Sequence, residues 1–572
     1  MSAPGTAAAQ HSPLRNPYTV LVLTLGLHAL LGVSAALQLH WSPFGDTPVL
    51  DELGYVQWAR GIVSGDVLGA DPFSQDPLFP YFLALLFKLF GGSLLAARLF
   101  QVGLGLGTTA LLFATGRRLF SPWAGAVAAL VFSFHGVIYL YEAELIKATL
   151  GLFSVALFFY ALARATADAR LRWWAAVGAT FALLMLYRGN FVPLLPFLAG
   201  WAGFHASREW RRRLVVGAVV LGSTLLVLSP VTIRNYVVSG DFILTRSHGG
   251  SNFYIGNNPA ASGSYVRLPF VRSSPEYEAI DLQAEAERRT GHKMLPTEVS
   301  RFWFQEGFNY LRANPEAWAR LWWAKVLLAL NAYEVPDNYS FECMRSEFMP
   351  ALYLGVVDFG VLLALAALGA VLAMRERRLR VLVIGSLLYA GTLVFFYVFS
   401  RYRVPLVIPL VLLAGHGVAS FGVFRRDARH LALAAGLVVF MLGVSHVTLK
   451  QTESREHLMA QCYSLLGATQ TQRGEHESAV EYLRRSAALD GSLPESWYNL
   501  GVAQHTANHK ADAEQAYERA ISLNPRHGQA MFNLSLLHAE RGDTGGARAL
   551  LERAIAAGFD NAKSRAALEA LR

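Results

Sequence analysis

Cysteine is scarce in this chain, which has only Cys343 and Cys462 among 572 residues. So few thiols exclude a disulfide-stapled framework and a thiolate metal site, and they leave a single pairing open. Charge is also scarce, since Asp, Glu, Lys and Arg make up 16% of the sequence and hydrophobic residues 53%. An average soluble domain has about 25% charged residues. The composition therefore indicates an integral membrane protein.

The net charge of +9 does not indicate a nucleic-acid partner. Its Lys and Arg residues form short clusters between apolar runs, whereas nucleic-acid binding calls for one basic patch. A histidine metal site is not indicated either, because His135, His416 and His446 lie singly within apolar runs. Membrane topology accounts better for the positive charge.

The apolar runs predict a polytopic helix bundle over residues 18–449. A membrane-spanning helix needs about 20 mainly apolar residues, and about eleven runs meet this expectation. The first is longer than a signal-peptide core of about 7 to 15 residues, so it predicts an uncleaved membrane helix. The runs are residues 18–39, 94–116, 121–140, 148–164, 173–188, 190–206, 213–230, 351–373, 381–399, 404–423 and 431–449.

Basic clusters fall on one side of this predicted topology, which the positive-inside rule makes cytoplasmic. Residues 1–17 are then a cytoplasmic tail, and loops 40–93 and 231–349 are extracytoplasmic. The apolar segment 316–330 contains Arg320 and Lys325, and its length and the loop parity favour an interfacial or re-entrant helix. If it spans, the C-terminal part moves to the cytoplasm. The short loops and composition favour a bacterial inner membrane.

Residues 450–572 are polar and repeat with a period of 34 residues. "WYNLGVAQHTANHKADAEQAYERAISLNP" places Trp497, Gly501, Ala513, Tyr517 and Pro525 at the spacings of a tetratricopeptide repeat. Shifts of 34 residues in both directions give three repeats over about 460–561. Stacked repeats form a concave groove suited to a peptide or protein partner. The predicted fold class is thus all-α: a membrane helix bundle followed by a tetratricopeptide solenoid.

Acidic pairs stand in two of the predicted extracytoplasmic loops. Asp51 and Glu52 follow the first span, and Tyr55 begins an apolar stripe one turn later; Glu142 and Glu144 lie between two spans beside Lys147. Acids in a first helical turn can simply complement the helix dipole. Acids on two loops of the same face also suit either a general base or an oxygen-ligand metal site, and spacing does not choose between these.

Arginines at span ends on this same side run against the ordinary charge bias. Arg401 and Arg403 lie in "SRYRVPLVIPL". Guanidinium groups bind phosphate oxygens bidentately, so a phosphate leaving group is a natural partner. Residues in similar positions are Arg188, Arg234, Asn235 and Tyr402. The glycine-rich segment 249–263 is predicted to be an exposed loop, with phosphate binding or gating as the alternative.

Taken in order, these motifs resemble a known family. "DE" after the first span, "EAE" after the third, "IRNY", "GGSNFYIGNNP" and "RYRVPLVIPL" are similar to integral-membrane glycosyltransferases of the GT-C superfold. They resemble family 39, the protein O-mannosyltransferase and aminoarabinose-transferase relatives, over roughly residues 18–425. The tetratricopeptide repeats are similar to those of animal O-mannosyltransferases.

The resemblance implies a polyprenyl-phosphate or polyprenyl-diphosphate sugar donor and transfer to a hydroxyl acceptor on the extracytoplasmic face. It implies that Asp51 is the base toward the acceptor, with Glu52 beside it. Glu142 and Glu144 would orient the acceptor or contact a divalent metal, although the motif is E-x-E and not D-x-D, so metal dependence stays open.

The resemblance also implies which cations hold the donor phosphate. Arg401 and Arg403 are the expected ligands, and Lys147 and Arg234 are expected to assist them. Tyr55, Arg188, Asn235 and Tyr402 are possible supporting residues.

The expected reaction is a single displacement with inversion, and the repeats favour a protein acceptor. Two alternatives remain: a transferase for lipid A or a cell-envelope glycan, and a non-enzymatic membrane scaffold that presents the repeats. A transporter is disfavoured because the charges cluster at one membrane face and not at mid-bilayer.

Overall fold

The computed structural model describes residues 16–168, 170–272, 275–426 and 428–571, and in these ranges it contains helices and no strands. The predicted all-α fold class is confirmed. Most of the predicted cytoplasmic tail, residues 1–15, lies outside the described residues.

Seven helices in the described ranges are long and apolar enough to cross a membrane, and a pair bent by 67° makes an eighth. The seven are α1 (Pro17–Trp41), α4 (Leu94–Leu119), α7 (Ala148–Ala167), α10 (Trp210–Ser239), the segment Pro350–Ala373 with α16 (Phe359–Ala373), the segment Ser400–Arg426 with α18 (Ser400–Ala419), and α19 (Ala428–Ser445). The bent pair is α5 (Pro122–Ser133) and α6 (Val137–Ala143).

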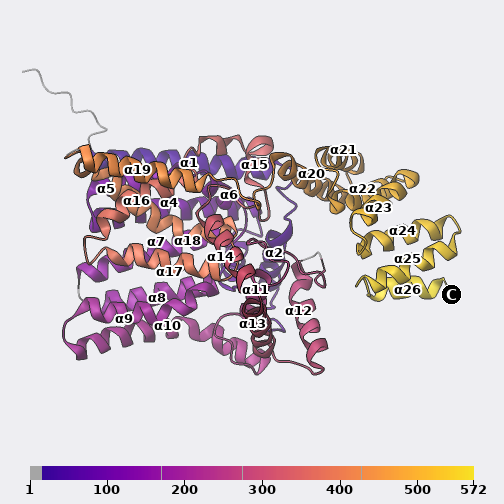
Figure 1. The fold of residues 1–572 in the computed structure, drawn as a ribbon, viewed down its shortest axis with the longest axis horizontal. Coiled ribbons are helices and arrows are strands. Elements are labelled where there is room, and N and C mark those ends of the chain that lie inside the picture. Colours follow the sequence, from indigo (N-terminus) through magenta and orange to yellow (C-terminus); the bar gives the residue numbers. More distant parts are fainter. Residues whose placement is uncertain (1–15, 169, 273–274, 427, 572) are drawn as a thin grey trace, which may run out of the picture.

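The other three predicted spans form shorter helices in the same bundle. They are α8 (Leu171–Tyr187), α9 (Leu195–Ala206) and α17 (Arg380–Phe395). Figure 1 shows α7, α8, α10, α17 and α18 running side by side.

Glycines bring several of these helices into close contact. A Cβ on Gly369 of α16 would lie 1.8 Å from the carbonyl oxygen of Leu413 in α18, and a Cβ on Gly116 of α4 would lie 2.7 Å from Cα of Gly125 in α5. Since apolar surface gives helices no preference for each other over lipid, close packing at small residues is a main source of their association.

The two long predicted loops fold into helices at one end of the bundle. They form α2 (Leu50–Val63), α3 (Leu78–Leu89), α11 (Gly249–Gly256), α12 (Pro275–Thr290), α13 (Pro296–Ala313), α14 (Pro315–Leu330), the short α15 (Phe341–Cys343) and the turn η3 (Met344–Phe348). Helix α14, at 16 residues, is not among the spans found in the described chain, and it exposes Trp318, Trp322 and Trp323.

The glycine-rich segment is not an exposed loop, as the sequence had suggested, because its first half forms the packed helix α11. A Cβ on Gly250 would lie 1.7 Å from the carbonyl oxygen of Ser300, and one on Gly256 would lie 2.1 Å from that of Phe396. These glycines allow close backbone approach to α13 and to the segment before α18.

The C-terminal part is a row of antiparallel helices: α20 (Arg455–Gln472), α21 (His476–Leu489), α22 (Pro494–Thr506), α23 (Lys510–Leu523), α24 (Gly528–Glu540), α25 (Thr544–Ala556) and α26 (Ala562–Ala570). The repeated glycines have a packing role. A Cβ on Gly467 would lie 2.3 Å from Cγ of Leu483, and one on Gly501 would lie 2.6 Å from Cδ1 of Tyr517.

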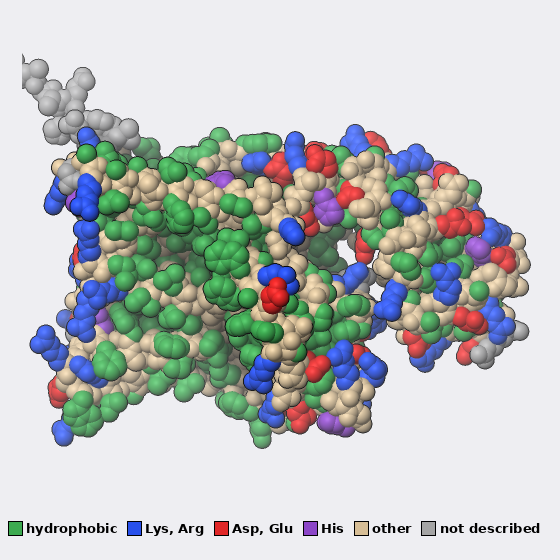
Figure 2. All heavy atoms as spheres, viewed as in Figure 1, with side chains coloured by type: hydrophobic (Ala, Val, Ile, Leu, Met, Phe, Trp, Pro, Cys, Tyr) green, Lys and Arg blue, Asp and Glu red, His purple; other side chains and the backbone are tan. Residues whose placement is uncertain are grey.

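The repeats are tied to the end of the bundle that carries α15 (Figure 1). A disulfide joins Cys343 of α15 to Cys462 of α20, which settles the pairing that the sequence left open. Arg455 also lies 3.1 Å from Glu342. Lys and Arg side chains gather at the opposite, left-hand end of the bundle in Figure 2.

Candidate active site

A charged cavity of about 430 Å³ lies at the end of the bundle that faces the repeats. It is enclosed by α2, α11, α12, the start of α18 and the loops beside them. Its charged lining residues are Asp51, Lys147, Arg246, Arg267, Arg272, Glu278, Asp337 and Arg401, and its tyrosines are Tyr55, Tyr265, Tyr397 and Tyr402. The fold thus brings three further predicted site residues, Lys147, Arg401 and Tyr402, into the same lining as Asp51 and Tyr55, although they are far from these two in the sequence.

Asp51 and Arg401 form the central ion pair of this cavity. Asp51 Oδ2 lies 2.8 Å from Nη1 of Arg401, and the Nε of Arg401 lies 2.6 Å from Asp337 Oδ2. Arg401 is 7% exposed and Asp51 21% exposed, so the aspartate is the more accessible partner. Burial raises the pKa of Asp337 despite the opposing effect of Arg401. Asp51 is therefore the better placed carboxylate to accept a proton from a molecule in the cavity.

The backbone before Asp51 has an unusual conformation. Leu50 has φ of 50°, in the left-handed region that residues with a side chain rarely adopt. The Asp51 N–H donates to Asn338 Oδ1 at 3.3 Å. Such conformations persist where the surrounding structure holds them in place, and the bond to Asn338 is one contact that does so.

Glu52 lies outside the cavity lining and is fully buried. Its Oε1 lies 3.2 Å from Arg98 Nη2 and accepts from the N–H of Leu145 at 3.1 Å, and its Oε2 accepts from the hydroxyl of Tyr339 at 3.0 Å. This carboxylate joins α2 to α4, to the loop before α7 and to the loop after α14. Its contacts are those of a structural link.

The second acidic motif splits between two environments. Glu142 Oε1 lies 2.9 Å from His28 Nε2 inside the bundle. Burial raises the pKa of Glu144, and the nearby Glu52 and Asp337 add to this effect. The carboxylates of Glu142 and Glu144 therefore lie in separate surroundings. In the described ranges, no cluster of three or more His, Cys, Asp or Glu is arranged to hold a metal ion.

Lys147 and Arg246 share one buried carboxylate, Asp76. Arg246 Nε lies 3.3 Å from Asp76 Oδ1, and Lys147 Nζ bonds to Asp76 Oδ2. Although burial raises it, the two cations hold the pKa of Asp76 below its usual value. Burial lowers the pKa of Lys147 to about 7, against the effect of Asp76 and with help from Arg188, Arg246 and Arg401. Positive charge thus exceeds negative charge at this wall.

Arg188 lies beside this group, among aromatic rings. Its guanidinium is 3.9 Å from the ring centre of Tyr402, and the residue is 3% exposed. Its Nε and Nη2 have no hydrogen-bond partner among the described residues. Because a buried N–H without a partner is costly, this arginine is suited to an anionic ligand.

Three other predicted residues do not line the cavity. Arg403 is buried and bonds to the carbonyl oxygens of Asn331 and Tyr333 and to Glu334. Arg234 bonds to the carbonyl oxygen of Leu68. Asn235 donates to the carbonyls of Ile243 and Thr245 at 3.2 and 3.1 Å. Their contacts hold loops in place.

Sequence reasoning missed Asp76, Arg246, Glu278 and Asp337. These residues stand in or next to the long loops, where no repeat or apolar period marks them. The one available signal was weak: each is a charged residue on the side of the membrane that already held the acidic pairs and Arg401.

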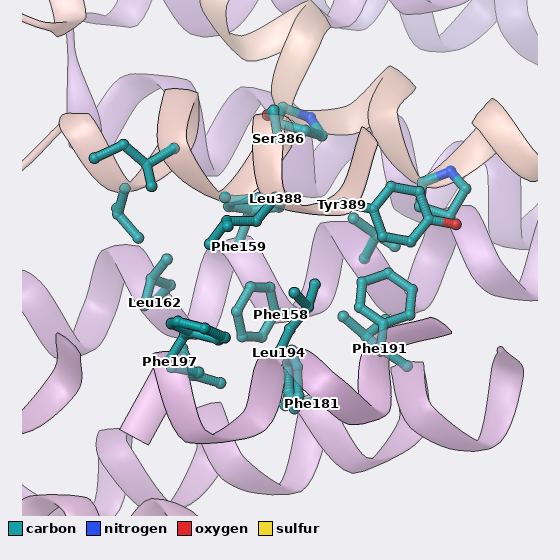
Figure 3. Close-up of a pocket in the computed structure, with 18 of the residues that line it drawn as sticks. Phe158, Phe159, Leu162, Phe181, Phe191, Leu194, Phe197, Ser386, Leu388 and Tyr389 are labelled. Carbon is teal, nitrogen blue, oxygen red and sulfur yellow. The ribbon is translucent and has the colours of Figure 1, made fainter. Parts of the chain in front are cut away.

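An apolar cavity of about 270 Å³ lies between α7, α8, α9, α17 and α18 (Figure 3). Phe158, Phe181, Phe191 and Tyr389 point into it (Figure 3). The hydroxyl of Tyr389 donates to the carbonyl oxygen of Tyr402 at 3.1 Å. Tyr389 therefore connects the apolar cavity to a residue of the charged cavity.

Two family models match parts of the chain. Residues 72–233 match the family model described as dolichyl-phosphate-mannose-protein mannosyltransferase. These matched residues are here called the mannosyltransferase-family segment. Residues 494–527 match the tetratricopeptide repeat. The predicted resemblance to a membrane glycosyltransferase with tetratricopeptide repeats is confirmed.

The mannosyltransferase-family segment contains Asp76, Glu142, Glu144, Lys147 and Arg188. It ends before the predicted arginines of α18 and begins after the first acidic pair. The charged cavity is thus built from this segment together with flanking parts of the chain.

Curated relatives match shorter stretches. The chain is 29% identical over 134 residues to the protein O-mannosyl-transferase TMTC1 of Mus musculus, covering 22% of this chain and 14% of the relative. It is 36% identical over 81 residues to the probable biofilm formation methyltransferase WspC of Pseudomonas aeruginosa. That match covers 14% of this chain and 19% of the relative. The chain spans at most 28% of the length of the curated relatives it matches.

Among solved structures, one similar structure is ArnT from Cupriavidus metallidurans bound to undecaprenyl phosphate. The alignment covers 93% of this chain and 79% of the ArnT chain. The sequence identity is 16% and the TM-score 0.41.

Proposed function

We propose that the protein is a membrane glycosyltransferase that moves a sugar from a polyprenyl-phosphate or polyprenyl-diphosphate donor to a hydroxyl group of a protein. The observation that carries the proposal is the accessible Asp51 carboxylate, paired with Arg401 in a cavity whose far wall is rich in cations. The mannosyltransferase-family segment supports it.

The donor is assigned to both cavities. Its phosphate would lie near Arg401, Lys147 and the unpartnered N–H groups of Arg188, and its first isoprenyl units would enter the apolar cavity past Tyr389. Charge-assisted hydrogen bonds stabilise a phosphate more strongly than neutral ones. An apolar cavity lined by phenylalanines stabilises a prenyl chain through burial.

The proposed reaction is a single displacement. The acceptor hydroxyl oxygen attacks the anomeric carbon, the bond from that carbon to the donor phosphate oxygen breaks, and Asp51 takes the hydroxyl proton. Arg401 and the neighbouring cations stabilise the charge that develops on the departing polyprenyl phosphate. Attack opposite the leaving group inverts the anomeric carbon.

A cleft beside the charged cavity favours a protein acceptor. A cleft of about 600 Å³, here called the repeat cleft, lies between the loop 267–272 and the repeats. Arg267 and Arg272 line both this cleft and the charged cavity, so the two are adjacent. An extended polypeptide held against the repeats would therefore lead toward Asp51. A lipid A or glycan acceptor would give the repeat cleft no role.

The first test is sugar transfer by the purified full-length protein in nanodiscs, with a panel of polyprenyl-phosphate sugars and an envelope-protein extract. Mass spectrometry identifies the modified acceptor. A protein whose mass increases by one sugar supports the proposal; folded protein that transfers from no donor in the panel would favour the scaffold alternative.

Lys147 predicts how donor use depends on pH. Because its pKa is about 7, the ammonium is present below pH 7 and is lost as pH rises above it. We expect kcat/KM for the donor to fall by up to about tenfold per pH unit above 7, since this ratio reports ionisations of the free enzyme. Lys147→Arg should abolish that slope, because arginine stays charged.

Lys325 provides the matched control for this pH profile. Burial also lowers its pKa to about 7, but its Nζ bonds to Asn257 Oδ1 at 2.9 Å away from the charged cavity. Lys325→Arg should keep the wild-type slope. A slope that survives in Lys147→Arg contradicts the assignment of this lysine to the donor.

Charge in the repeat cleft predicts the preferred acceptor. Arg267, Arg272, Arg526 and Lys563 line it, against the single acid Glu495. An acceptor segment with acidic flanking residues is therefore favoured. We expect the double variant Arg526→Glu with Lys563→Glu to raise KM for such a protein by about tenfold and to leave kcat unchanged.

Arg519→Glu on α23 is the control, because Arg519 is exposed but does not line the repeat cleft. It should leave KM at the wild-type value. Equal KM values in all three proteins would argue against the cleft as the route of the acceptor.

We also infer that this end of the molecule is extracytoplasmic and that the membrane is a bacterial inner membrane. The Cys343–Cys462 disulfide supports this side, because disulfides persist in oxidising compartments. The basic clusters at the opposite end support the same orientation.

A further inference from the structure

A second polar cavity lies at the end of the bundle opposite the charged cavity. This basic cavity, of about 560 Å³, is formed by the turn between α9 and α10 and the turn between α16 and α17. Its lining includes Arg208, Arg213, Arg377, Arg378 and His205, and no carboxylate lines it. Four guanidinium groups therefore converge on one space at the left-hand end of the bundle in Figure 2.

Two of these arginines are held in place by the protein and two are not. Arg213 Nε donates to the carbonyl oxygen of Ser207 at 2.9 Å, and Arg378 Nε lies 3.1 Å from Glu376. Within the described part of the chain, the side chains of Arg208 and Arg377 form no ion pair and no hydrogen bond. Their donors are available to an anion, and the lining of the cavity offers no carboxylate to neutralise them.

The surroundings of the basic cavity are those of a membrane surface. Phe204 lines it, and Phe197, Phe204 and Trp210 are more than 60% exposed on α9 and α10. Exposed aromatic residues of this kind gather at the level of lipid headgroups. One turn deeper, Trp201 and Arg380 belong to the lining of the apolar cavity. A lipid here would meet guanidinium groups at its head and the exposed aromatic side chains of α9 and α10 along its tail.

We propose that the basic cavity binds the phosphate headgroup of an anionic membrane lipid. Guanidinium groups bind phosphate oxygens bidentately, and basic pockets between membrane helices suit anionic headgroups. The shared chemistry is a lipid phosphate, and its source is either a bilayer phospholipid or a polyprenyl phosphate. The site lies at the other end of the bundle from Asp51 and does not depend on transferase activity.

The test uses full-length protein in detergent and native mass spectrometry with three probes: phosphatidylglycerol, a polyprenyl phosphate and phosphatidylcholine. Arg208→Gln with Arg377→Gln should weaken phosphatidylglycerol binding by about thirtyfold, at roughly five- to sixfold per arginine. The control is Arg425→Gln with Arg426→Gln, two exposed arginines of η5 (Phe421–Arg426) at the same end that do not line the cavity. It should change binding by less than about twofold, since only general surface charge is altered.

Each outcome has a definite meaning. Tighter binding of phosphatidylglycerol assigns the site to a bilayer phospholipid, and tighter binding of polyprenyl phosphate assigns it to the carrier lipid. Equal losses in both double variants would overturn the proposal, because ordinary positive-inside charge would explain them. Phosphatidylcholine binding as tight as that of the anionic lipids, or displacement by inorganic phosphate at the same concentration, would overturn it too. Intrinsic tryptophan fluorescence during heating verifies that all variants are folded.

Discussion

Replacing Asp51 with Asn is expected to abolish sugar transfer and to leave the protein folded. Asparagine fills the same space and can still accept a hydrogen bond from Arg401, but it cannot take a proton from the acceptor. General-base catalysis contributes about 10²- to 10⁴-fold to a reaction rate, so kcat should fall by at least the lower figure. The measurement is transfer from a polyprenyl-phosphate sugar in nanodiscs, with the melting temperature recorded for each variant.

Asp337→Asn is the matched control, because Asp337 is the second carboxylate beside Arg401. Asp337 is the less exposed of the two carboxylates, at 16% against 21% for Asp51, so it is less accessible to an acceptor hydroxyl. We expect this variant to keep most of its kcat and to lose some donor affinity. If instead Asp337→Asn is inactive while Asp51→Asn transfers sugar at the wild-type rate, the base is Asp337.

Glu52→Ala is expected to be the most destabilising single change near the site. It removes the carboxylate that lies 3.2 Å from Arg98, and both residues are fully buried. Breaking a buried ion pair from one side costs about 3–5 kcal/mol, because the remaining charge is left without a partner. The free energy of unfolding should fall by that amount, which heating with tryptophan fluorescence detects as a lower melting temperature.

Two comparisons separate a structural role of Glu52 from a catalytic one. Glu477→Ala removes an exposed acid of α21 and should leave the melting temperature unchanged. Glu52→Ala combined with Arg98→Met should recover part of the lost stability, since no unpaired charge remains. A Glu52→Ala protein with wild-type stability and no transfer would instead place Glu52 in the catalytic machinery.

These two variants show what the sequence could and could not predict. Asp51 and Arg401 could be assigned to one site in advance, because Asp51 follows an apolar run and Arg401 precedes one on the same predicted side of the membrane. Their neighbours could not be assigned with them. Successive helical residues point about 100° apart, so Glu52 faces the bundle while Asp51 faces the cavity. Arg403, two positions after Arg401, likewise points at backbone carbonyls.

The remaining walls of the charged cavity come from segments without a periodic pattern. Asp76, Arg246 and Asp337 are brought together by the packing of long loops, and no spacing in the sequence encodes that packing. The helix α11 was missed for a related reason. Its glycines are typical of a turn, but here they allow close contact with neighbouring backbone.

The disulfide between Cys343 and Cys462 also constrains how the chain is threaded through the bilayer. Two cysteines can be joined only if they lie in the same compartment, so the chain between them must cross the membrane an even number of times. The helices α16, α18 and α19 meet the length criterion for a span, and three crossings would leave the two thiols on opposite sides. The 16-residue helix α17 must then be the fourth crossing. Oxidation of this pair therefore reports that an even number of these four helices has crossed the membrane, so a chain with any one of them left out would keep its two thiols apart.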